Sequence, residues 1–475
     1  MREIGSILNG RVAESTLGKT RDIASPYDGH LVTRAVAADE SVIARAIENA
    51  VAARPIMRDL APFERADILE RFSRLVAERK DELAQILCEE AGKPISLAKI
   101  EAERCAQTIA DAAHWARYYE QEMLGLDGSP VGAGRQGILR RFPVGVVAAI
   151  TPFNFPLNLV AHKIAPAIAA GCPVVLKPAS QTPSPAFRLA QLAVEAGLPK
   201  EGIQVVLVRG GDADRLVTDE RIALVTFTGS AEVGWQIKSR CGKKKVALEL
   251  GGNAGAIVEP DSDWENAARR IATGGFAYAG QSCISVQRVF VHSSIAPKFT
   301  DALVAAAEAV PSGDPADPKT VCGPLIDEAN VARVKQWIER AIGRGGRALT
   351  GNRVEGAVLF PTVMIDVPAD CEVNCSEVFG PVVTVATYDS FDQALEMVND
   401  SRYGLQAGVF TNDIRKIWKA YEALEVGGVI HNDVPTFRVD LMPYGGVKDS
   451  GVGREGARWA IQEMTEPRLL VLSTR

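Results

Sequence analysis

The 475-residue sequence has few cysteines, no long apolar run and no excess of basic residues. Its eight cysteines are too sparse for a disulfide scaffold, and none lies in a Cys-x-x-Cys pair. Cys371 and Cys375 come closest, but their spacing, with no histidine nearby, makes a poor metal site. The longest uncharged apolar run, 164–176, is broken by two prolines and is too short to span a bilayer. No disulfide scaffold, bound metal or membrane span is therefore expected.

The charge balance and the opening residues exclude further classes of protein. With 53 basic and 59 acidic residues, the formal net charge is −6, so the basic stripe that binds phosphate backbones is not expected. The opening segment, MREIGSILNG, lacks the apolar stretch of a signal peptide. We therefore expect a cytoplasmic protein with no nucleic-acid or membrane partner. Its length predicts two or three domains, because single cores stop growing at about 250–300 residues.

The N-terminal part of the chain is predicted to be largely helical. Apolar residues recur at helical spacing over 41–91, Gly92 follows as a stop signal, and a further helix is expected over 101–119. Residues 120–141 are rich in glycine and polar residues without a helical period. They fit either a flexible linker or an extended hairpin arm.

From Pro143 onward, short β-branched runs alternate with helical stretches. This pattern predicts βαβ units around a mostly parallel sheet that is buried on both faces. A second α/β series should follow from about Asp263. The final strand, 468–473, has no neighbouring strand in sequence, so we expect it to pair with another region or another subunit. The strands expected in the first series are 146–150, 173–176, 205–207, 224–226, 246–250 and 256–258, with helices from about 156, over 184–196 and after 230.

Two strand-to-helix segments carry residues suited to ligand binding. Asn154, in TPFNFP, follows a buried strand at the edge where open sheets bind ligands, although a turn asparagine is the plain alternative. In FTGSAEVG, residues 227–234, glycines would let the backbone approach a diphosphate at a helix N-terminus. This G-S-x-x-x-G pattern is weak alone and also fits a structural turn. Lys177 ends a strand two units earlier, where it could reach a ribose.

Two further segments carry a candidate base and a candidate nucleophile. Glu249, in LELGGN, lies between leucines at the end of an apolar strand, so its pKa should be raised and suit a general base. A glutamate that caps a loop is the alternative. Cys283, in GQSCIS, is flanked by small and polar residues, unlike a core cysteine such as Cys172. Its thiol would need a base or a helix dipole to become reactive, and a packing cysteine is the alternative.

Together these segments resemble the aldehyde dehydrogenase family over essentially the whole chain. TPFNFP, FTGSAEVG, LELGGN, GQSCIS, EVFGP and PYGGVK occur in the order of that family, and Glu249 and Cys283 are 34 residues apart, as is usual there. The resemblance implies an α/β fold with an arm that makes homodimers or homotetramers through strand edges. The implied parts are a Rossmann-like NAD(P)-binding domain (1–119 and 142–250), a catalytic domain (251–445) and a β-hairpin oligomerisation arm (120–141 and 460–475).

The resemblance also implies a mechanism and a cofactor. The Cys283 thiolate would attack an aldehyde, with the Asn154 amide and the Cys283 backbone N–H on the oxyanion. Hydride transfer to NAD or NADP would leave a thioester, hydrolysed by water that Glu249 deprotonates rather than passed to coenzyme A. Ser180 stands where strict NAD users of the family carry glutamate, so NADP should be tolerated. The implied cofactor-binding residues are Thr151, Phe153, Lys177, Ser180, Gly229, Ser230, Gly234, Glu377 and Phe379.

The resemblance implies a short polar substrate. Residues 431–454 resemble the branch with lactaldehyde and related hydroxyaldehyde or phosphonoaldehyde dehydrogenases, so an aldehyde such as lactaldehyde or glycolaldehyde is expected. Ser282 stands where enzymes for strongly anionic aldehydes often carry arginine, which argues against phosphorylated or phosphonate substrates. A semialdehyde or phosphorylated-aldehyde dehydrogenase, a coenzyme A-acylating enzyme and a non-catalytic relative remain alternatives. The implied pocket residues are Phe155, Leu159, His162, Ser282 and Ile284, of which the first three share a helix face.

Three of the polar residues keep a second interpretation. His162 could equally be a packed core residue. Arg104 and Arg438 are candidates for contact with a carboxylate or hydroxyl group, with a surface salt bridge as the expected use of either.

Overall fold

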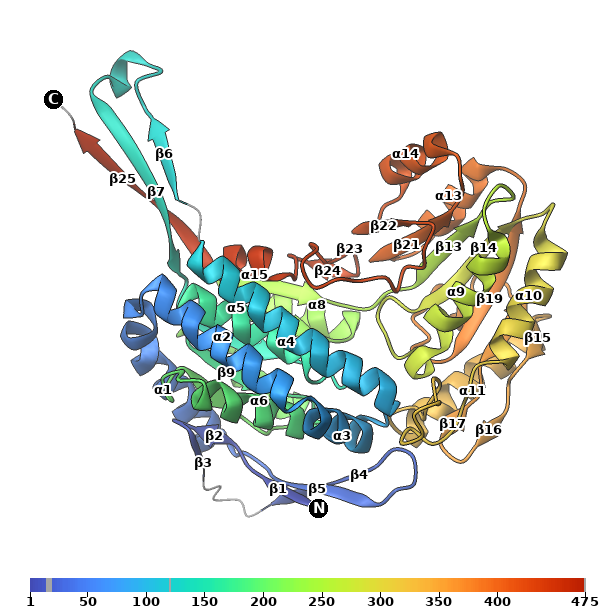
Figure 1. Cartoon of the computed structure of the whole chain (residues 1–475), viewed down its shortest axis with the longest axis horizontal. Coiled ribbons are helices and arrows are strands. Elements are labelled where there is room, and N and C mark those ends of the chain that lie inside the picture. The colour runs from blue at the N-terminus through green and yellow to red at the C-terminus, as the bar shows by residue number, and fades with distance from the viewer. Residues whose placement is uncertain (14–18, 119–120, 474–475) are drawn as a thin grey trace.

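The computed structural model describes residues 1–13, 19–118 and 121–473 as two α/β lobes with a narrow sheet projecting from the first (Figure 1). The helices predicted over 41–91 are present, and Gly92 ends the last of them with a φ of +61°. The next helix begins before residue 101, and Tyr119 lies outside the described residues. Within the described ranges, no helix is long and apolar enough to cross a membrane. The N-terminal helices are α1 (Glu40–Asp59), α2 (Pro62–Glu78), α3 (Lys80–Ala91) and α4 (Ile95–Arg117).

The first lobe is built on an eight-stranded sheet of order β24-β12-β11-β8-β9-β10-β2-β3. Its five central strands are parallel, and successive residues of β8 enter two different apolar cores, so the predicted sheet buried on both faces is confirmed. Helices α2, α4, α5 and α6 cover one face, and α1 and α8 cover the other. The strands are β2 (Ile7–Leu8), β3 (Arg11–Val12), β8 (Val146–Ile150), β9 (Val174–Lys177), β10 (Ile203–Val205), β11 (Ile222–Thr228), β12 (Lys245–Glu249) and β24 (Gly451–Val452). The helices after β8 are α5 (Asn158–Ala170), α6 (Ser184–Glu195), α7 (Asp214–Thr218) and α8 (Ala231–Arg240).

The second lobe is built on a seven-stranded sheet of order β15-β18-β19-β14-β13-β21-β22. The expectation that 256–258 closes the first series is wrong, because β13 pairs with β14 and β21 of this second sheet. The free edge of β12 is taken instead by β24, which arrives from about 200 residues later in the chain. The strands are β13 (Ala254–Val258), β14 (Val286–His292), β15 (Arg347–Thr350), β18 (Thr362–Ile365), β19 (Val382–Tyr388), β21 (Gln406–Phe410) and β22 (Gly428–His431). The helices are α9 (Trp264–Phe276), α10 (Ala296–Glu308), α11 (Glu328–Gly343), α12 (Glu372–Cys375), α13 (Phe391–Asn399) and α14 (Ile414–Ala423). Two short antiparallel pairs lie outside the main sheets: β16 (Val354–Glu355) with β17 (Val358–Leu359), and β20 (Tyr403–Gly404) with β23 (Val447–Lys448).

A third sheet forms the projecting arm, and a fourth lies at the N-terminus (Figure 1). The predicted hairpin is present as β6 (Glu122–Gly125) and β7 (Arg135–Pro143), and the terminal strand β25 (Thr465–Ser473) pairs with β7 along its whole length. Residues 460–463 are not part of the arm, because they complete α15 (Ala457–Glu463), which packs on the first lobe. The N-terminal sheet contains β1 (Arg2–Ile4), β4 (Thr20–Ala24) and β5 (Leu31–Val36).

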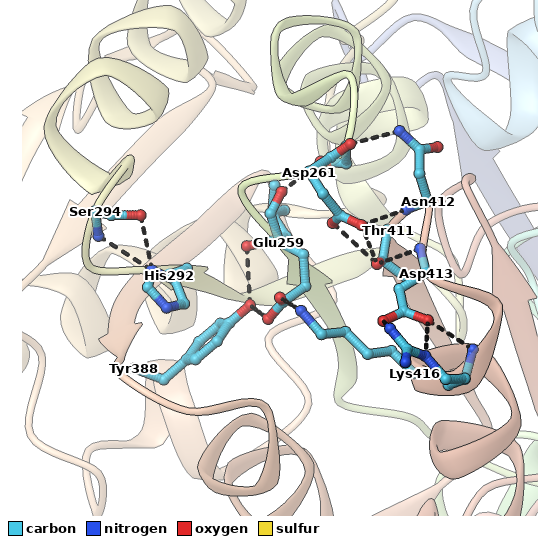
Figure 2. A network of polar contacts seen from close by, with 12 residues as sticks. Glu259, Asp261, His292, Ser294, Tyr388, Thr411, Asn412, Asp413 and Lys416 are labelled. Carbon is cyan, nitrogen blue, oxygen red and sulfur yellow. Dashed lines mark hydrogen bonds and ion pairs between the residues drawn. The ribbon is translucent and has the colours of Figure 1, made fainter.

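A polar network closes the carboxyl ends of the strands in the second sheet (Figure 2). Glu259, which is 2% exposed and follows β13, accepts from the Tyr388 hydroxyl at 2.5 Å and from Lys416 Nζ. Asp261 accepts from the Thr411 hydroxyl at 2.9 and 3.0 Å. The carboxyl edge of a parallel sheet is the usual ligand site, but here its polar groups bond to one another. The amino end of the second sheet, where Cys283 precedes β14, therefore faces the first lobe.

Candidate active site

A cavity of about 1050 Å³ lies between the carboxyl ends of the first sheet and the amino end of the second. It is lined by twelve of the seventeen residues expected at the site: Thr151, Phe153, Asn154, Leu159, Lys177, Ser180, Gly229, Ser230, Glu249, Cys283, Glu377 and Phe379. Gly234 does not line it. A Cβ there would lie 2.3 Å from Leu250 Cδ2, so this glycine lets α8 pack closely against the end of β12.

The Cys283 thiol is half-buried, and its raised pKa keeps it protonated at neutral pH. Burial raises its pKa to about 12, the Glu377 and Glu249 carboxylates add to this effect, and the Tyr444 hydroxyl and Arg438 oppose it. Its Sγ lies 2.8 Å from the Tyr444 hydroxyl oxygen. The backbone N–H of Cys283 has no hydrogen-bond partner among the described residues. An attack by this sulfur therefore needs a base to take the proton, and an unpaired N–H is free to bind the oxygen of whatever is attacked.

Asn154 lies against the turn that carries the thiol. Only 4% of it is exposed, and its Nδ2 donates to the carbonyl oxygen of Gln281 at 3.0 Å, two residues before Cys283. The Gln281 side chain fixes this turn, since its Nε2 donates to the carbonyls of Tyr278 and Pro324 and its Oε1 accepts from a backbone N–H. One N–H of the Asn154 amide remains free for a ligand.

Glu249 ends β12 as a buried carboxyl group beside a second acid. Burial raises its pKa well above the ordinary value and the negative charge of Glu455 raises it further, while Lys163 and Arg438 oppose the shift. Glu455 takes the opposite direction, with its pKa lowered to about 2 by Lys163 and other cations against the effect of burial. Lys163 Nζ lies 3.4 Å from Glu455 Oε1, and Glu249 Oε2 has no partner in the described part of the chain. Glu249 is therefore the weaker acid of the pair and the stronger base.

Comparison with known proteins decides the family. The model of the aldehyde dehydrogenase family matches residues 12–470. The chain belongs to the aldehyde dehydrogenase family. It is 41% identical over 474 residues to the 3-sulfolactaldehyde dehydrogenase of Priestia megaterium (100% of this chain, 98% of the relative) and 39% identical over 458 residues to the lactaldehyde dehydrogenase of Methanocaldococcus jannaschii (95% and 97%). Aldehyde dehydrogenase 21 of Physcomitrella patens, solved with the reaction product succinate, has a TM-score of 0.96 at 41% identity and covers 100% of this chain and 98% of its own.

The fold and family that the sequence predicts are thus confirmed, and this aldehyde dehydrogenase is NAD(P)-dependent, as structural neighbours have been solved with NADP. The cavity suits a dinucleotide. Ser230 caps the N-terminus of α8, whose free backbone N–H groups attract phosphate. Burial, with repulsion by Arg21, lowers the pKa of Lys177 to about 8, and burial raises that of Glu377 to about 7 against the opposing effects of the Gly252 N–H and Arg333. Glu377 Oε1 accepts from Gly252 N at 3.1 Å, and a Cβ on Gly251 would lie 2.3 Å from Glu377 Oε2, so a side chain there would displace this carboxylate.

The expected substrate residues of this dehydrogenase are less closely grouped. Phe155 precedes α5 rather than sharing a helix face with Leu159 and His162, and its ring packs edge to face on Tyr278. His162 is 1% exposed, with Nε2 2.8 Å from Asp440 Oδ1. Ile284 is buried against Leu405 and Tyr444 beside the thiol, and the part-exposed Ser282 donates its backbone N–H to Gly280.

The arginine expectation is wrong for Arg438 and partly wrong for Arg104. Arg438 is 8% exposed, its guanidinium lies 3.7 Å from the centroid of the Tyr444 ring, and Nη2 donates to Glu455 Oε2 at 3.0 Å. Arg104 is 29% exposed and donates twice to the buried Asp440 carboxylate. Within the described ranges Arg438 forms no surface ion pair, and Arg104 forms a partly exposed one with the buried Asp440.

Three residues of the site escape sequence reasoning. Tyr444 belongs to PYGGVK, a segment that carries the family resemblance, but only the fold brings its hydroxyl to Cys283. Lys163 lies in the apolar α5, where a lone lysine signals a buried partner, and Glu455 follows a glycine-rich loop with no distinguishing pattern. Both come together only because the 446–459 segment returns to the first lobe.

Proposed function

We propose that this dehydrogenase oxidises a short polar or hydroxy aldehyde to its carboxylic acid, through a covalent intermediate on Cys283 that is hydrolysed by water activated by Glu249. The observation that carries the proposal is the meeting of three groups from separate elements. A half-buried thiol, a free amide N–H beside its turn and a carboxyl group of raised pKa line one cavity. Each has an ordinary structural use alone, but together they supply a nucleophile, an oxyanion donor and a base.

The side chains account for the movements of protons and charge. The Cys283 proton passes to solvent in the cavity as the sulfur attacks the carbonyl carbon. The negative oxygen that forms accepts from Asn154 Nδ2 and the backbone N–H of Cys283. Lys177, Glu377 and the N-terminus of α8 would hold NAD(P), which would supply the hydride acceptor. Glu249 then removes a proton from the water that hydrolyses the thioester, and the negative charge of Glu455 strengthens it as a base.

The proposal is tested by following reduced nicotinamide with purified protein. Lactaldehyde, glycolaldehyde, aliphatic aldehydes and semialdehydes are each offered with NAD and NADP, with and without coenzyme A. Turnover that favours the hydroxyaldehydes and does not need coenzyme A is expected. A strict requirement for coenzyme A would refute the hydrolytic step, and equal rates on simple aliphatic aldehydes would refute the substrate class.

Arg438 supports a second candidate, an aldehyde that carries a carboxylate or sulfonate. Its Nε is buried without a hydrogen-bond partner among the described residues, and its positive charge opposes the raised pKa of the Cys283 thiol. Relatives of this chain are named for sulfonated aldehydes, and aldehyde dehydrogenase 21 was solved with succinate. Asp440 weakens the case, because Oδ1 lies 3.8 Å from the same Nε.

Arg438→Met is expected to separate the two candidates. If the substrate is anionic, loss of a charge-assisted contact worth about 1.5–3 kcal/mol should raise its KM by about 10- to 100-fold. The KM of lactaldehyde should then change by less than about threefold. Steady-state kinetics on succinic semialdehyde and lactaldehyde provide the comparison, and equal effects on both would remove the second candidate.

We further propose that NADP is preferred over NAD. A second cavity of about 370 Å³ adjoins the cleft at Ser180 and is lined by Lys19, Arg21 and Arg209. Burial and repulsion by Arg209 lower the pKa of Arg21, and neither arginine forms an ion pair within the described ranges. Such a cluster of unpaired cations favours a dianionic group such as the 2′-phosphate of NADP.

Arg209→Ala is expected to raise the KM of NADP by about 10- to 100-fold, the effect of losing one charge-assisted hydrogen bond. The KM of NAD should change by less than about threefold, because NAD has no charge at that position. Initial rates at saturating aldehyde measure both values. A parallel rise for the two cofactors would contradict the assignment of this cavity.

We propose that the arm joins copies of this chain in a homodimer or homotetramer. In the described part of the chain, β25 pairs only with β7, and its residues 469–472 are 40–54% exposed although all are apolar. A long apolar strand edge of this kind pairs with another chain or aggregates. The double substitution Leu470→Lys and Leu472→Lys is expected to give monomers by light scattering, whereas Ile342→Lys, an exposed apolar position on α11, should not. An unchanged mass for the double variant would contradict the role of the arm.

A further inference from the structure

A lysine outside the cofactor cavity has its ammonium group enclosed by two aromatic rings. Lys93 follows Gly92 in the link between α3 and α4 and is 1% exposed. Its Nζ lies 3.7 Å from the centroid of the Phe155 ring and 4.4 Å from that of the Tyr278 ring. The two rings meet edge to face with centroids 6.2 Å apart. One buried cation therefore contacts rings from two distant segments.

Those segments are the ones that carry the proposed oxyanion donor and nucleophile. Phe155 directly follows Asn154 in the chain. Tyr278 belongs to the turn η3 (Ala277–Gly280), which leads through Gln281 to Cys283. Its φ is +52°, in the left-handed region that a large side chain adopts only where surrounding contacts impose it. The Tyr278 hydroxyl donates to the carbonyl of Ala91 at 3.2 Å, so this turn is also tied to the α3–α4 link.

The carboxylate that pairs with Lys93 extends the contact to α5. Glu101 Oε2 accepts from Lys93 Nζ, while Oε1 accepts from the backbone N–H groups of Leu157 and Asn158 at 3.0 and 3.1 Å. A carboxylate at the N-terminus of a helix is favoured by the helix dipole and satisfies N–H groups that have no partner inside the helix. Glu101 thus fixes the start of α5, four residues beyond Asn154.

We propose that the Lys93–Glu101 pair is a positioning device that holds the Asn154 segment and the Cys283 turn at a fixed separation, so that the Asn154 amide stays aimed at the oxyanion. The inference rests on the proposed roles of Asn154 and Cys283. Neither Lys93 nor Glu101 lines the cofactor cavity, so the pair acts on catalysis through the two segments that it joins. A misplacement of about 1 Å can lower a rate by about 100-fold, so a modest shift of either segment has a large kinetic effect.

The lysine keeps its charge at neutral pH. Burial lowers its pKa to about 8, with Arg104 adding to this effect, while Glu101 opposes it through its charge and hydrogen bond. Removing Lys93 alone would leave Glu101 buried without its cation and could unfold the protein. The informative change therefore removes both charges together.

The double variant Lys93→Met with Glu101→Gln is the main test. A glutamine oxygen can still accept from the N-terminus of α5, and replacing a buried ion pair by neutral groups is often harmless to stability. We expect a Tm close to that of the parent and a Kd for NADP within about twofold. The rate of the first-turnover burst of reduced nicotinamide should fall by about 10- to 100-fold. Lys93→Arg, which keeps the cation between the rings, should recover part of this rate.

A second ion pair controls for the loss of a lysine–glutamate pair with a buried carboxylate. Lys416, which is 33% exposed, and the buried Glu259 pair at the carboxyl edge of the second sheet (Figure 2), whereas Cys283 lies at its amino end. Lys416→Met with Glu259→Gln is expected to leave the burst rate unchanged. In an Asn154→Ala background, the Lys93/Glu101 double variant should have little further effect, because both changes act on the same oxyanion.

The inference is overturned if the Lys93/Glu101 variant keeps the parent burst rate, or if the Lys416/Glu259 variant loses as much. Additive effects with Asn154→Ala would equally show that the pair does not act through the amide. The proposed function fails in a different way, through a Cys283→Ala variant that still gives a burst. Loss of the burst in Cys283→Ala with a normal burst in the Lys93/Glu101 variant would reject the positioning role alone.

Discussion

Cys283→Ala is expected to lower kcat by about 10⁴-fold or more while NADP still binds with its parent Kd. Removal of a covalent nucleophile costs about this much in other enzymes, because the remaining oxyanion donors cannot replace the bond that it makes. The first-turnover burst should vanish along with steady-state turnover. Stopped-flow absorbance of reduced nicotinamide measures both, and cofactor binding is followed by tryptophan fluorescence.

A second cysteine provides the control for Cys283. Cys88 is 4% exposed in α3, and burial raises its pKa to about 12, as for Cys283. Cys88→Ala is expected to lose some stability through a small cavity but to keep kcat within about twofold. Equal loss of activity in both variants would mean that packing, rather than nucleophilicity, explains the effect at Cys283.

Glu249→Gln is expected to separate the two halves of the reaction. The amide cannot remove a proton from water, so the thioester should accumulate and kcat should fall by about 10²- to 10⁴-fold. The first-turnover burst should persist, with an amplitude close to one per active site. Hydroxylamine, which attacks a thioester without a base, should restore part of the steady-state rate. A variant with no burst would show that Glu249 is needed earlier, as the base that takes the thiol proton.

The pH dependence gives a second measure of the same carboxyl group. Burial and Glu455 raise the pKa of Glu249, and only its ionised form is a base. The steady-state rate of the parent should therefore rise as pH increases through this raised pKa, and it should be lost as pH falls below it. The slow rate of Glu249→Gln should not show this rise. A pH profile shared by the two proteins would assign the titration to another group.

Local sequence pattern predicts most of the fold, because each βαβ unit consists of consecutive residues. The five parallel strands of the first sheet and the helices before residue 91 were expected from period and turn residues, and the hairpin arm was one of two interpretations of residues 120–141. The errors concern pairing over long distances. No sequence pattern near β13 indicates that β24 already pairs with the edge of β12. Because that edge is occupied, β13 pairs in the second lobe instead.

The candidate site divides in the same way. Asn154, Glu249 and Cys283 stand in recognisable segments, and the structure brings them to one cavity. The groups that set their electrostatics, such as Arg438 and Glu455, come from the segment that returns near the end of the chain. Their burial depends on packing against α4 and α5, which sequence spacing does not reveal. Sequence therefore predicts the reacting groups better than the charges that tune them.

The proposed oxyanion donor and nucleophile belong to different sheets, since Asn154 follows β8 and Cys283 precedes β14. A small rotation of one lobe against the other would separate them while every strand stayed paired. The catalytic rate is thus more sensitive to lobe movement than the fold is, because a displacement of about 1 Å already lowers the rate by about 100-fold. Activity should therefore be lost at a lower temperature, or at a lower denaturant concentration, than the one that unfolds either sheet. Activity is consequently a more sensitive measure than secondary structure of how firmly the two lobes are joined.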